Sequence, residues 1–309
     1  MELSILLANQ IASLFIILGI GFGLTRSNIL KVQDSRILSL ITLYVLNPCS
    51  IINSYLIAFN QETFNGLLLA ILAAIIIQFL MNILSNIFGR IFKLNHIEIA
   101  SVIYTNAGNL IIPLVAVLLG DEWVIYASGY IMVQTTFMWT HGKNLVRQKK
   151  GFKFKDIFKN LNVIAVIIGL ICFLLQLKLP SFIGVSIKNL GSMLGTSAML
   201  TIGMSLGHIK FKEVVMQPRN YLVCVLRLIV IPFIAILFIH FSGLLTLHPQ
   251  ARQILLITTL AVCAPVAATI SQFATLYQSH PKEAGAINVL SVIMCIITMP
   301  VMVYFYQIL

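Results

Sequence analysis

Long apolar stretches alternate with short polar segments along the whole chain. A helix that crosses the hydrocarbon core of a bilayer needs about 20 apolar residues, because each residue advances it by about 1.5 Å. Stretches of this kind occupy residues 4–25, 36–58, 64–88, 97–119, 122–142, 161–177, 186–207, 219–241, 252–276 and 285–307. The pattern predicts an all-α membrane protein with ten transmembrane helices.

The basic residues between these stretches gather on one side when successive segments are assigned to alternate sides of a membrane. That side collects sixteen of the twenty Lys and Arg residues, and the other side collects Lys178, Lys188 and Arg252. Basic loops are retained in the cytoplasm. We therefore expect a multi-pass protein of the inner cell membrane, with both termini outside.

The longest polar segment divides the chain into two equal parts. Residues 1–142 are predicted to form a first repeat of five helices, residues 143–160 a basic cytoplasmic connector, and residues 161–309 a second repeat of five helices. Because five is odd, the second repeat enters the membrane from the opposite side, as in secondary transporters built from inverted repeats. The connector, with aromatic residues among its lysines, is either a short helix on an anionic leaflet or an ordinary basic loop.

Composition narrows the classes of function further. Hydrophobic residues make up 59% of the chain and charged residues 9%, against about 25% charged residues in soluble domains. This composition excludes a soluble enzyme. The net charge of +11 is explained by basic cytoplasmic loops, so no nucleic-acid partner is expected. The chain has no P-loop or metal-ligand spacing, so neither a cofactor nor a metal is expected. The match of residues 203–207 to a nucleophile elbow lies in an apolar stretch that has no acid to complete a triad.

Polar residues and prolines interrupt the fourth and ninth stretches at similar depth. The fourth contains Asn106, Asn109 and Pro113, and the ninth contains Pro265 and Gln272. Broken helices at matching positions of inverted repeats indicate a transport site, because unwound backbone survives in a membrane only beside protein or a water-filled cavity. For each proline taken alone, a simple kink of its helix is the alternative.

Two further polar residues lie within apolar stretches. Asn47 precedes Pro48 and either faces the same cavity or bonds to a carbonyl that Pro48 leaves free. Arg227 either attracts an anionic substrate or extends toward the nearby cytoplasmic face, and the short distance favours the second interpretation. All nine acidic residues fall in loops or at helix ends, which argues against an ion-exchanging antiporter.

Glycines recur at steps of four, or multiples of four, in the seventh stretch, and this pattern predicts close helix packing.

At these motifs the chain resembles the auxin efflux carrier family, which contains plant PIN-type carriers and bacterial malonate and malate permeases. The matching residues are Asn47-Pro48, Thr105-Asn106-Ala107-Gly108-Asn109 with Pro113, Ile202-Gly203-Met204-Ser205-Leu206, Ala264-Pro265-Val266-Ala267 and Phe273-Ala274-Thr275-Leu276-Tyr277. The resemblance implies that helices four and nine unwind at their prolines and cross in mid-membrane, with a scaffold part and a movable transport part. It also implies that Asn106, Asn109, Pro113 and Pro265 line the substrate site.

The expected function is a carrier of small organic anions, such as dicarboxylates or auxin-like weak acids, that works by alternating access. Half-helix N-termini at a crossover attract a carboxylate without a lysine. Asn106 and Asn109 are expected to donate hydrogen bonds, with Asn47 and Gln272 completing the ring. A sodium-coupled symporter of the bile-acid type and a channel-like or sensory membrane protein are the alternatives. Expected partners are the substrate, membrane lipid and a second copy of the chain.

Overall fold

The computed structural model describes residue 13 and residues 16–148, 161–207 and 217–309. Within these residues the secondary structure is helical, and the one β contact is an isolated antiparallel bridge between Thr105 and Val266. The all-α prediction is confirmed, and each predicted apolar stretch overlaps a helix. Residues 149–160 of the predicted connector, with its candidate amphipathic helix, lie outside the described residues.

The helices in the part of the chain up to residue 148 join end to end into longer rods at several points. In order they are Ile16–Arg26, η1 (Val32–Asp34), α2 (Ser35–Ile41), η2 (Thr42–Leu46), α3 (Asn47–Tyr55), α4 (Gln61–Ile91), α5 (His96–Ile103), α6 (Ala107–Leu118), η3 (Asp121–Trp123), α7 (Val124–Phe137), η4 (Met138–Gly142) and α8 (Lys143–Arg147). The elements η2 and η4 are π-helical turns, so α2 runs through η2 into α3, and α7 runs through η4 into α8.

The helices after the connector follow a similar order. They are α9 (Leu161–Leu175), α10 (Ser181–Ser192), α11 (Leu194–Leu206), α13 (Pro218–Val225), η6 (Leu226–Val230), α14 (Ile231–Phe241), η7 (Leu244–Thr246), α15 (Ala251–Cys263), α16 (Ala268–Leu276) and α17 (Pro281–Ile308). A third π-helical turn, η6, joins α13 to α14.

Several helices have the length and composition of membrane spans. Among the described residues, four are long and apolar enough to cross a bilayer: Ser35–Tyr55, Gln61–Ile91, Pro218–Phe241 and Pro281–Ile308. Ile16–Arg26, Leu161–Leu175 and Ala251–Cys263 are apolar but shorter. Such a set of apolar helices is that of a multi-pass membrane protein.

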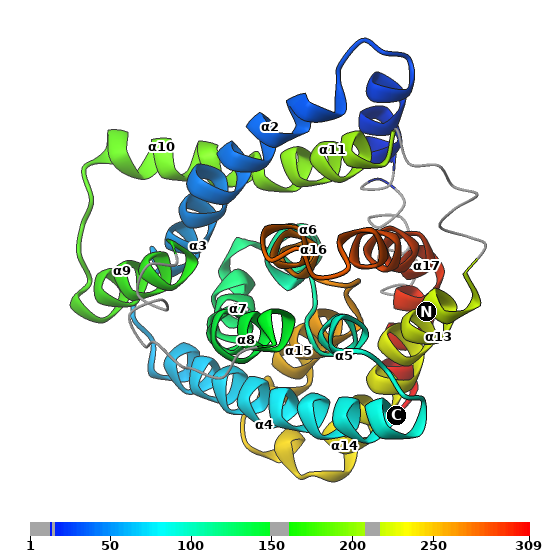
Figure 1. The fold of residues 1–309 in the computed structure, drawn as a ribbon. Coiled ribbons are helices and arrows are strands. Elements are labelled where there is room, and N and C mark those ends of the chain that lie inside the picture. The colour runs from blue at the N-terminus through cyan, green and yellow to red at the C-terminus, as the bar shows by residue number, and fades with distance from the viewer. Residues whose placement is uncertain (1–12, 14–15, 149–160, 208–216) are drawn as a thin grey trace.

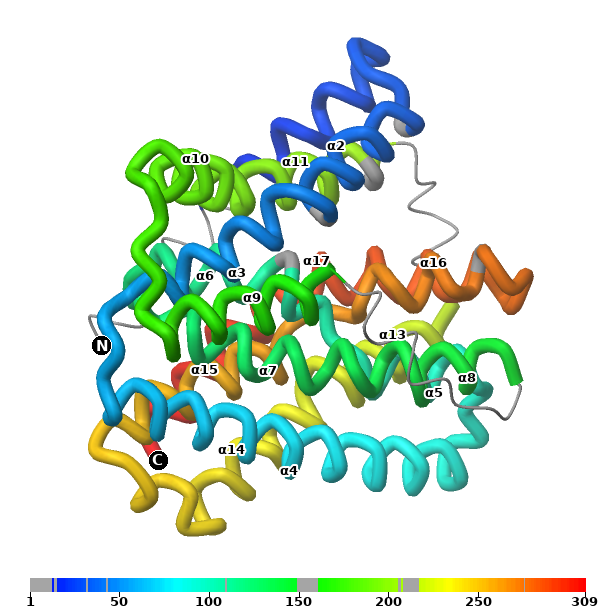
Figure 2. Tube along the Cα trace, turned by 90° about the vertical axis from the view of Figure 1, so that its left-hand side faces the viewer, coloured from blue at the N-terminus to red at the C-terminus, as the bar shows by residue number. Residues whose placement is uncertain are grey.

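The helices form two groups (Figures 1 and 2). The smaller group contains Ile16–Arg26, α2, α3 and α9–α11, where α3 packs on both α9 and α10, and α11 packs on α2. The larger group contains α4–α8 and α13–α17, with α5 and α15 near its centre and α6 and α16 on the side that faces the smaller group. Each group contains helices from before and after residues 149–160, so neither corresponds to a continuous part of the chain.

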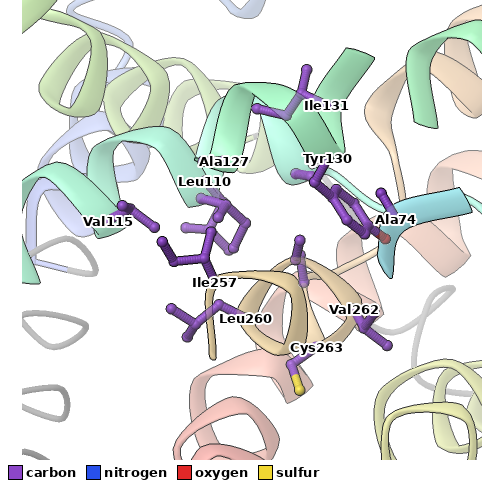
Figure 3. Packing of buried hydrophobic residues seen from close by; sticks show 14 of the residues in the cluster. Ala74, Leu110, Val115, Ala127, Tyr130, Ile131, Ile257, Leu260, Val262 and Cys263 are labelled. Atoms are coloured by element: carbon purple, nitrogen blue, oxygen red, sulfur yellow. The ribbon is translucent and has the colours of Figure 1, made fainter. Parts of the chain in front are cut away.

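The core of the larger group lies between α6, α7 and α15. Figure 3 shows Leu110 and Val115 of α6 facing Ile257 and Leu260 of α15, and all four side chains are buried. This apolar packing fixes the position of α15 against α6. The end of α15 and the start of α6 both lie next to an interruption of the helical rods.

Glycines allow close contact between helices where the sequence predicts it. A Cβ atom on Gly195 of α11 would lie 2.8 Å from the Cβ atom of Pro113 in α6, and one on Gly191 of α10 would lie 2.9 Å from the Cα atom of Ser50 in α3. Real Cβ atoms do not approach so closely, so these positions admit glycine best. The contact of Gly195 with Pro113 joins the smaller group to the larger one.

A buried carboxylate joins the N-terminal ends of α5, α13 and α17. Glu98 is fully buried, accepts from the backbone N–H of Asn95 at 2.7 Å in a capping box, and forms an ion pair with Arg219 of α13. The Asn95 amide donates to Glu283 of α17 at 2.9 Å. The sequence placed Glu98 at a helix end, which is confirmed, but gave no sign that it is buried. Capping boxes stabilise helix starts because the first N–H groups of a helix lack partners within it.

The ion pair is expected to respond unequally to removal of its two members. Arg219→Met leaves the Glu98 carboxylate buried without a cation, which should lower the free energy of unfolding by about 3 kcal/mol. Glu98→Gln should cost about 1 kcal/mol, because the Arg219 side chain is 47% exposed and water can solvate it. Thermal unfolding in detergent checks the order, with the exposed Arg90→Met as the control. Equal losses for the two variants would contradict this assignment.

Candidate functional site

Two helical rods are interrupted near the middle of the larger group. Helix α5 ends at Ile103 and α6 begins at Ala107, while α15 ends at Cys263 and α16 begins at Ala268. The second interruption has a local cause. A residue before proline is disfavoured in the α region, and Ala264, which precedes Pro265, has φ −64° and ψ 154°. The predicted break at Pro265 is therefore confirmed.

The first interruption does not lie where the sequence placed it. Pro113 is inside α6, and the unwound residues are 104–106. The prediction that helix four unwinds at Pro113 is wrong, because membrane helices tolerate a proline when neighbouring groups compensate for the lost hydrogen bond. Pro113 instead provides the ring surface on which Gly195 packs.

The two unwound segments bind each other, and we call residues 104–106 and 264–267 together the crossover. The backbone N–H of Asn106 donates to the carbonyl of Pro265 at 2.8 Å, and that of Ala267 donates to the carbonyl of Tyr104 at 3.0 Å. These two bonds flank the bridge between Thr105 and Val266. Backbone groups that leave a helix in an apolar medium need such partners, since an unpaired one costs several kcal/mol.

Side chains from α7 and α17 hold the crossover from outside. Gln134 of α7 donates to the carbonyl of Thr105 and accepts from its hydroxyl at 2.6 Å. On the other segment, Asn288 of α17 donates to the carbonyl of Val266 at 2.9 Å, and the Ser291 hydroxyl accepts from the N–H of Val266 at 3.0 Å. An amide thus donates to the carbonyl of each bridge residue.

Arg227 lies behind the crossover and is fully buried. Its guanidinium donates to the carbonyls of Val262 at 2.6 Å and Ala264 at 3.2 Å, and to that of Val102 at 3.4 Å. The interpretation that Arg227 extends to the cytoplasmic face is wrong, because these carbonyls provide polar partners inside the protein. A cation is also favourable here, since the C-terminal ends of α5 and α15 carry partial negative charge.

Each of the three π-helical turns adjoins this region. Asn47 directly follows η2, Met138 begins η4, and Arg227 lies within η6. A π-helical turn adds one residue to the repeat, which redirects the side chains around it, and such turns occur often at functional sites. Here they occur in three different rods, beside residues that lie on either side of the crossover.

A cavity of about 50 Å³ lies on the other side of the crossover from Arg227, where α6 and α16 begin. Twelve residues line it: Asn47, Thr105, Asn106, Ala107, Gly108, Ile131, Gln134, Thr135, Met138, Asn162, Ala267 and Thr269. Asn47 and Asn162 come from the smaller group of helices and the others from the larger group. The lining residues are uncharged, and amides and hydroxyls supply their polar side-chain atoms.

Asn47 and Asn106, both predicted at the site, lie at this cavity. Asn47 is 1% exposed, and neither its Nδ2 nor its Oδ1 atom has a hydrogen-bond partner. Asn47 therefore does not bond to a carbonyl freed by Pro48, and its amide lies beside the start of α6, where a Cβ atom on Gly108 would be 3.7 Å from Nδ2. Asn106 occupies the N-cap position of α6 without a side-chain capping bond.

The other predicted residues do not line the cavity or are not described. Gln272 is exposed on α16, and Thr269, about one turn earlier, lines the cavity in its place. Pro113 and Pro265 shape the backbone and are absent from the lining. The Asn109 side chain lies outside the described part of the molecule.

Sequence reasoning missed the polar residues Gln134, Thr135, Asn162 and Thr269. Gln134, Thr135 and Thr269 interrupt otherwise apolar stretches, which is the signal that could have identified them, whereas Asn162 lies at the start of a stretch beside the polar connector.

Comparison with known families gives one finding. The model of a family described as "Membrane transport protein" matches the chain twice, over residues 6–155 and residues 152–303. No curated protein matches the chain at a significant level.

The role assigned to Arg227 predicts a large loss of stability when its guanidinium is removed. Arg227→Met leaves the carbonyls of Val102, Val262 and Ala264 without that donor and should lower the free energy of unfolding by about 3 kcal/mol. Arg227→Lys keeps the charge with fewer donors and should lose less. Thermal unfolding in detergent measures both. The control is Arg90→Met, at an exposed site in the last turn of α4, with an expected change within about 0.5 kcal/mol.

An Arg227→Met protein that unfolds at the wild-type temperature would exclude this role.

Proposed function

Because this chain belongs to the membrane transport protein family, which includes the auxin efflux carriers, we propose that it carries small organic anions across a membrane by alternating access. Membership of the family indicates a membrane transporter. The observation that carries the finer proposal is the cavity at the crossover, where two half-helices begin and the buried amide of Asn47 has no partner.

The backbone at the cavity suits an anion. Helices α6 and α16, of twelve and nine residues, both begin at the cavity, and a helix N-terminus presents unpaired N–H groups and partial positive charge. Carboxylates bind at such positions in the same way as phosphates and sulfates. The side-chain amides of Asn47, Asn106 and Asn162 add hydrogen-bond donors to the cavity without adding a charge.

The position of the cavity supports alternating access. Its walls come from both groups of helices, so a movement of one group relative to the other changes which side of the cavity opens. The larger group carries the crossover and is the proposed movable part, and the smaller group is the proposed scaffold. The contact of Gly195 with Pro113 lies on the surface between them and offers little obstruction to sliding.

We also propose ten transmembrane helices in two inverted five-helix repeats, with both termini outside. The bonds around the crossover support this arrangement, since Gln134 and Asn288 perform the same task for the two bridge residues. Gln134 lies on the fifth rod and Asn288 on the tenth, which are equivalent positions in two repeats of five.

Transport measurements separate this proposal from the alternatives. Purified protein in proteoliposomes is loaded with unlabelled malonate and tested for exchange with external labelled malonate. Saturable exchange that is independent of sodium supports an anion carrier. A strict requirement for sodium would favour a symporter of the bile-acid type, and unitary currents would favour a channel.

Replacing Asn47 by leucine should separate stability from transport. Both polar atoms of the amide are buried without a partner, so Asn47→Leu is expected to raise the free energy of unfolding of the ligand-free protein by about 1 kcal/mol. The same change removes a donor from the cavity and should lower the rate of malonate exchange about tenfold. Thermal unfolding and exchange are measured on the same preparation.

The matched control is Asn86→Leu, at an exposed asparagine of α4 away from the cavity. It should leave exchange at the wild-type rate. If Asn47→Leu exchanges malonate as fast as the control variant does, Asn47 is not part of the site.

A further inference from the structure

The lining of the cavity contains no charged side chain among the described residues. Its polar side chains are Asn47, Thr105, Asn106, Gln134, Thr135, Asn162 and Thr269, and all of them are neutral. Any neutralisation of a bound anion must therefore come from the backbone.

Two helix N-termini supply the positive potential. Residues Ala107 and Gly108 open α6, and Ala267 and Thr269 lie at the start of α16. Each N-terminus is equivalent to about half a positive elementary charge, so the two together amount to about one. The Asn47 amide is 1% exposed and has no hydrogen-bond partner, and this independently indicates a hydrogen-bonding ligand in the cavity.

The guanidinium of Arg227 does not add to this balance. It is bonded to the carbonyls of Val102, Val262 and Ala264, where α5 and α15 end and where the two helix dipoles carry about one negative charge in total. It is also absent from the cavity lining. Its charge and those two C-terminal ends compensate each other on the far side of the crossover.

We propose that the site takes its ligand as a singly charged anion, either a monocarboxylate or the half-protonated form of a dicarboxylate. This rests on the proposed function. A dianion would place a second charge among buried neutral residues, after the first charge has already been balanced by the two helix N-termini. A buried charge without a partner is strongly disfavoured. A protonated carboxyl or an amide at the same position finds hydrogen-bond partners among the neutral amides and hydroxyls.

The test compares a dicarboxylate with its own monoamide. Malonate and malonamate, and likewise succinate and succinamate, compete with labelled malonate exchange in proteoliposomes between about pH 5 and about pH 8, a range over which second carboxyl groups lose their proton. The affinity for each monoamide should stay constant. The apparent affinity for each dicarboxylate should fall about tenfold per pH unit above its second pKa, because the monoanion becomes scarce.

The monoamide also controls for titration of the protein. Titratable groups on the elements around the cavity, outside its lining, are Tyr104, Tyr130 and His141, which bonds to the Tyr104 hydroxyl, with Arg227 and Cys263 behind the crossover. A change in any of these would alter the binding of both members of a pair. An equal fall for dicarboxylate and monoamide would therefore overturn the proposal, and so would tight binding of either dicarboxylate at about pH 8.

A designed cation provides a second arm. Thr269→Lys adds one positive charge at the start of α16 and should bring the dianion at about pH 8 to within about tenfold of the monoamide, whereas Thr269→Met, with similar length and no charge, should keep the preference for the monoanion. Loss of the preference in both variants would overturn the inference. If the wild-type protein exchanges none of the four acids at any pH, the proposed anion carrier itself fails. If it exchanges them without regard to charge, the carrier stands and this inference falls.

Discussion

A peptide group inside a bilayer has no water to bond to, and this constraint governs the centre of the molecule. Two helical rods are interrupted there, at residues 104–106 and 264–267, and interruption exposes N–H and C=O groups. The protein satisfies them by pairing one break with the other across the Thr105 and Val266 bridge, and by adding Gln134, Asn288 and Ser291 around it. Either break alone would leave backbone N–H and C=O groups unpaired in an apolar medium, which is strongly unfavourable, so the two breaks stabilise each other.

The same pairing orients charge. Where α5 and α15 end, their carbonyls gather around Arg227, and where α6 and α16 begin, their N–H groups face the cavity. The crossover thus separates a negative backbone region, which the guanidinium of Arg227 neutralises, from a positive one that faces the cavity. In this arrangement the proposed anion site needs no lysine or arginine of its own.

The sequence predicts well what depends on local chemistry. Apolar stretches of membrane length lie where helices lie, and Pro265 marks a break because it acts on the conformation of Ala264 alone. It predicts poorly what depends on partners from elsewhere in the chain. The first break lies at residues 104–106, not at Pro113, since Gln134 and the second segment bind those residues.

Arg227 likewise stays inside because distant carbonyls accept from it, which no property of its own stretch reveals. At the cavity, Asn47 and Asn106 were found from their polarity within apolar stretches, whereas the exposed position of Gln272 depends on which face of α16 packs inward.

The bridge between the two broken rods is made by main-chain atoms, and this has a consequence for how the protein can diversify. Main-chain bonds such as those from Asn106 to Pro265 and from Ala267 to Tyr104 do not depend on which side chain a residue carries. Replacing the side chains of Asn106 or Ala267, which line the cavity, therefore leaves these main-chain bonds in place, whereas Gln134 also holds the crossover through its side chain. Evolution can therefore change side chains at the cavity, and with them the proposed solute specificity, while the main-chain bonds of the crossover persist.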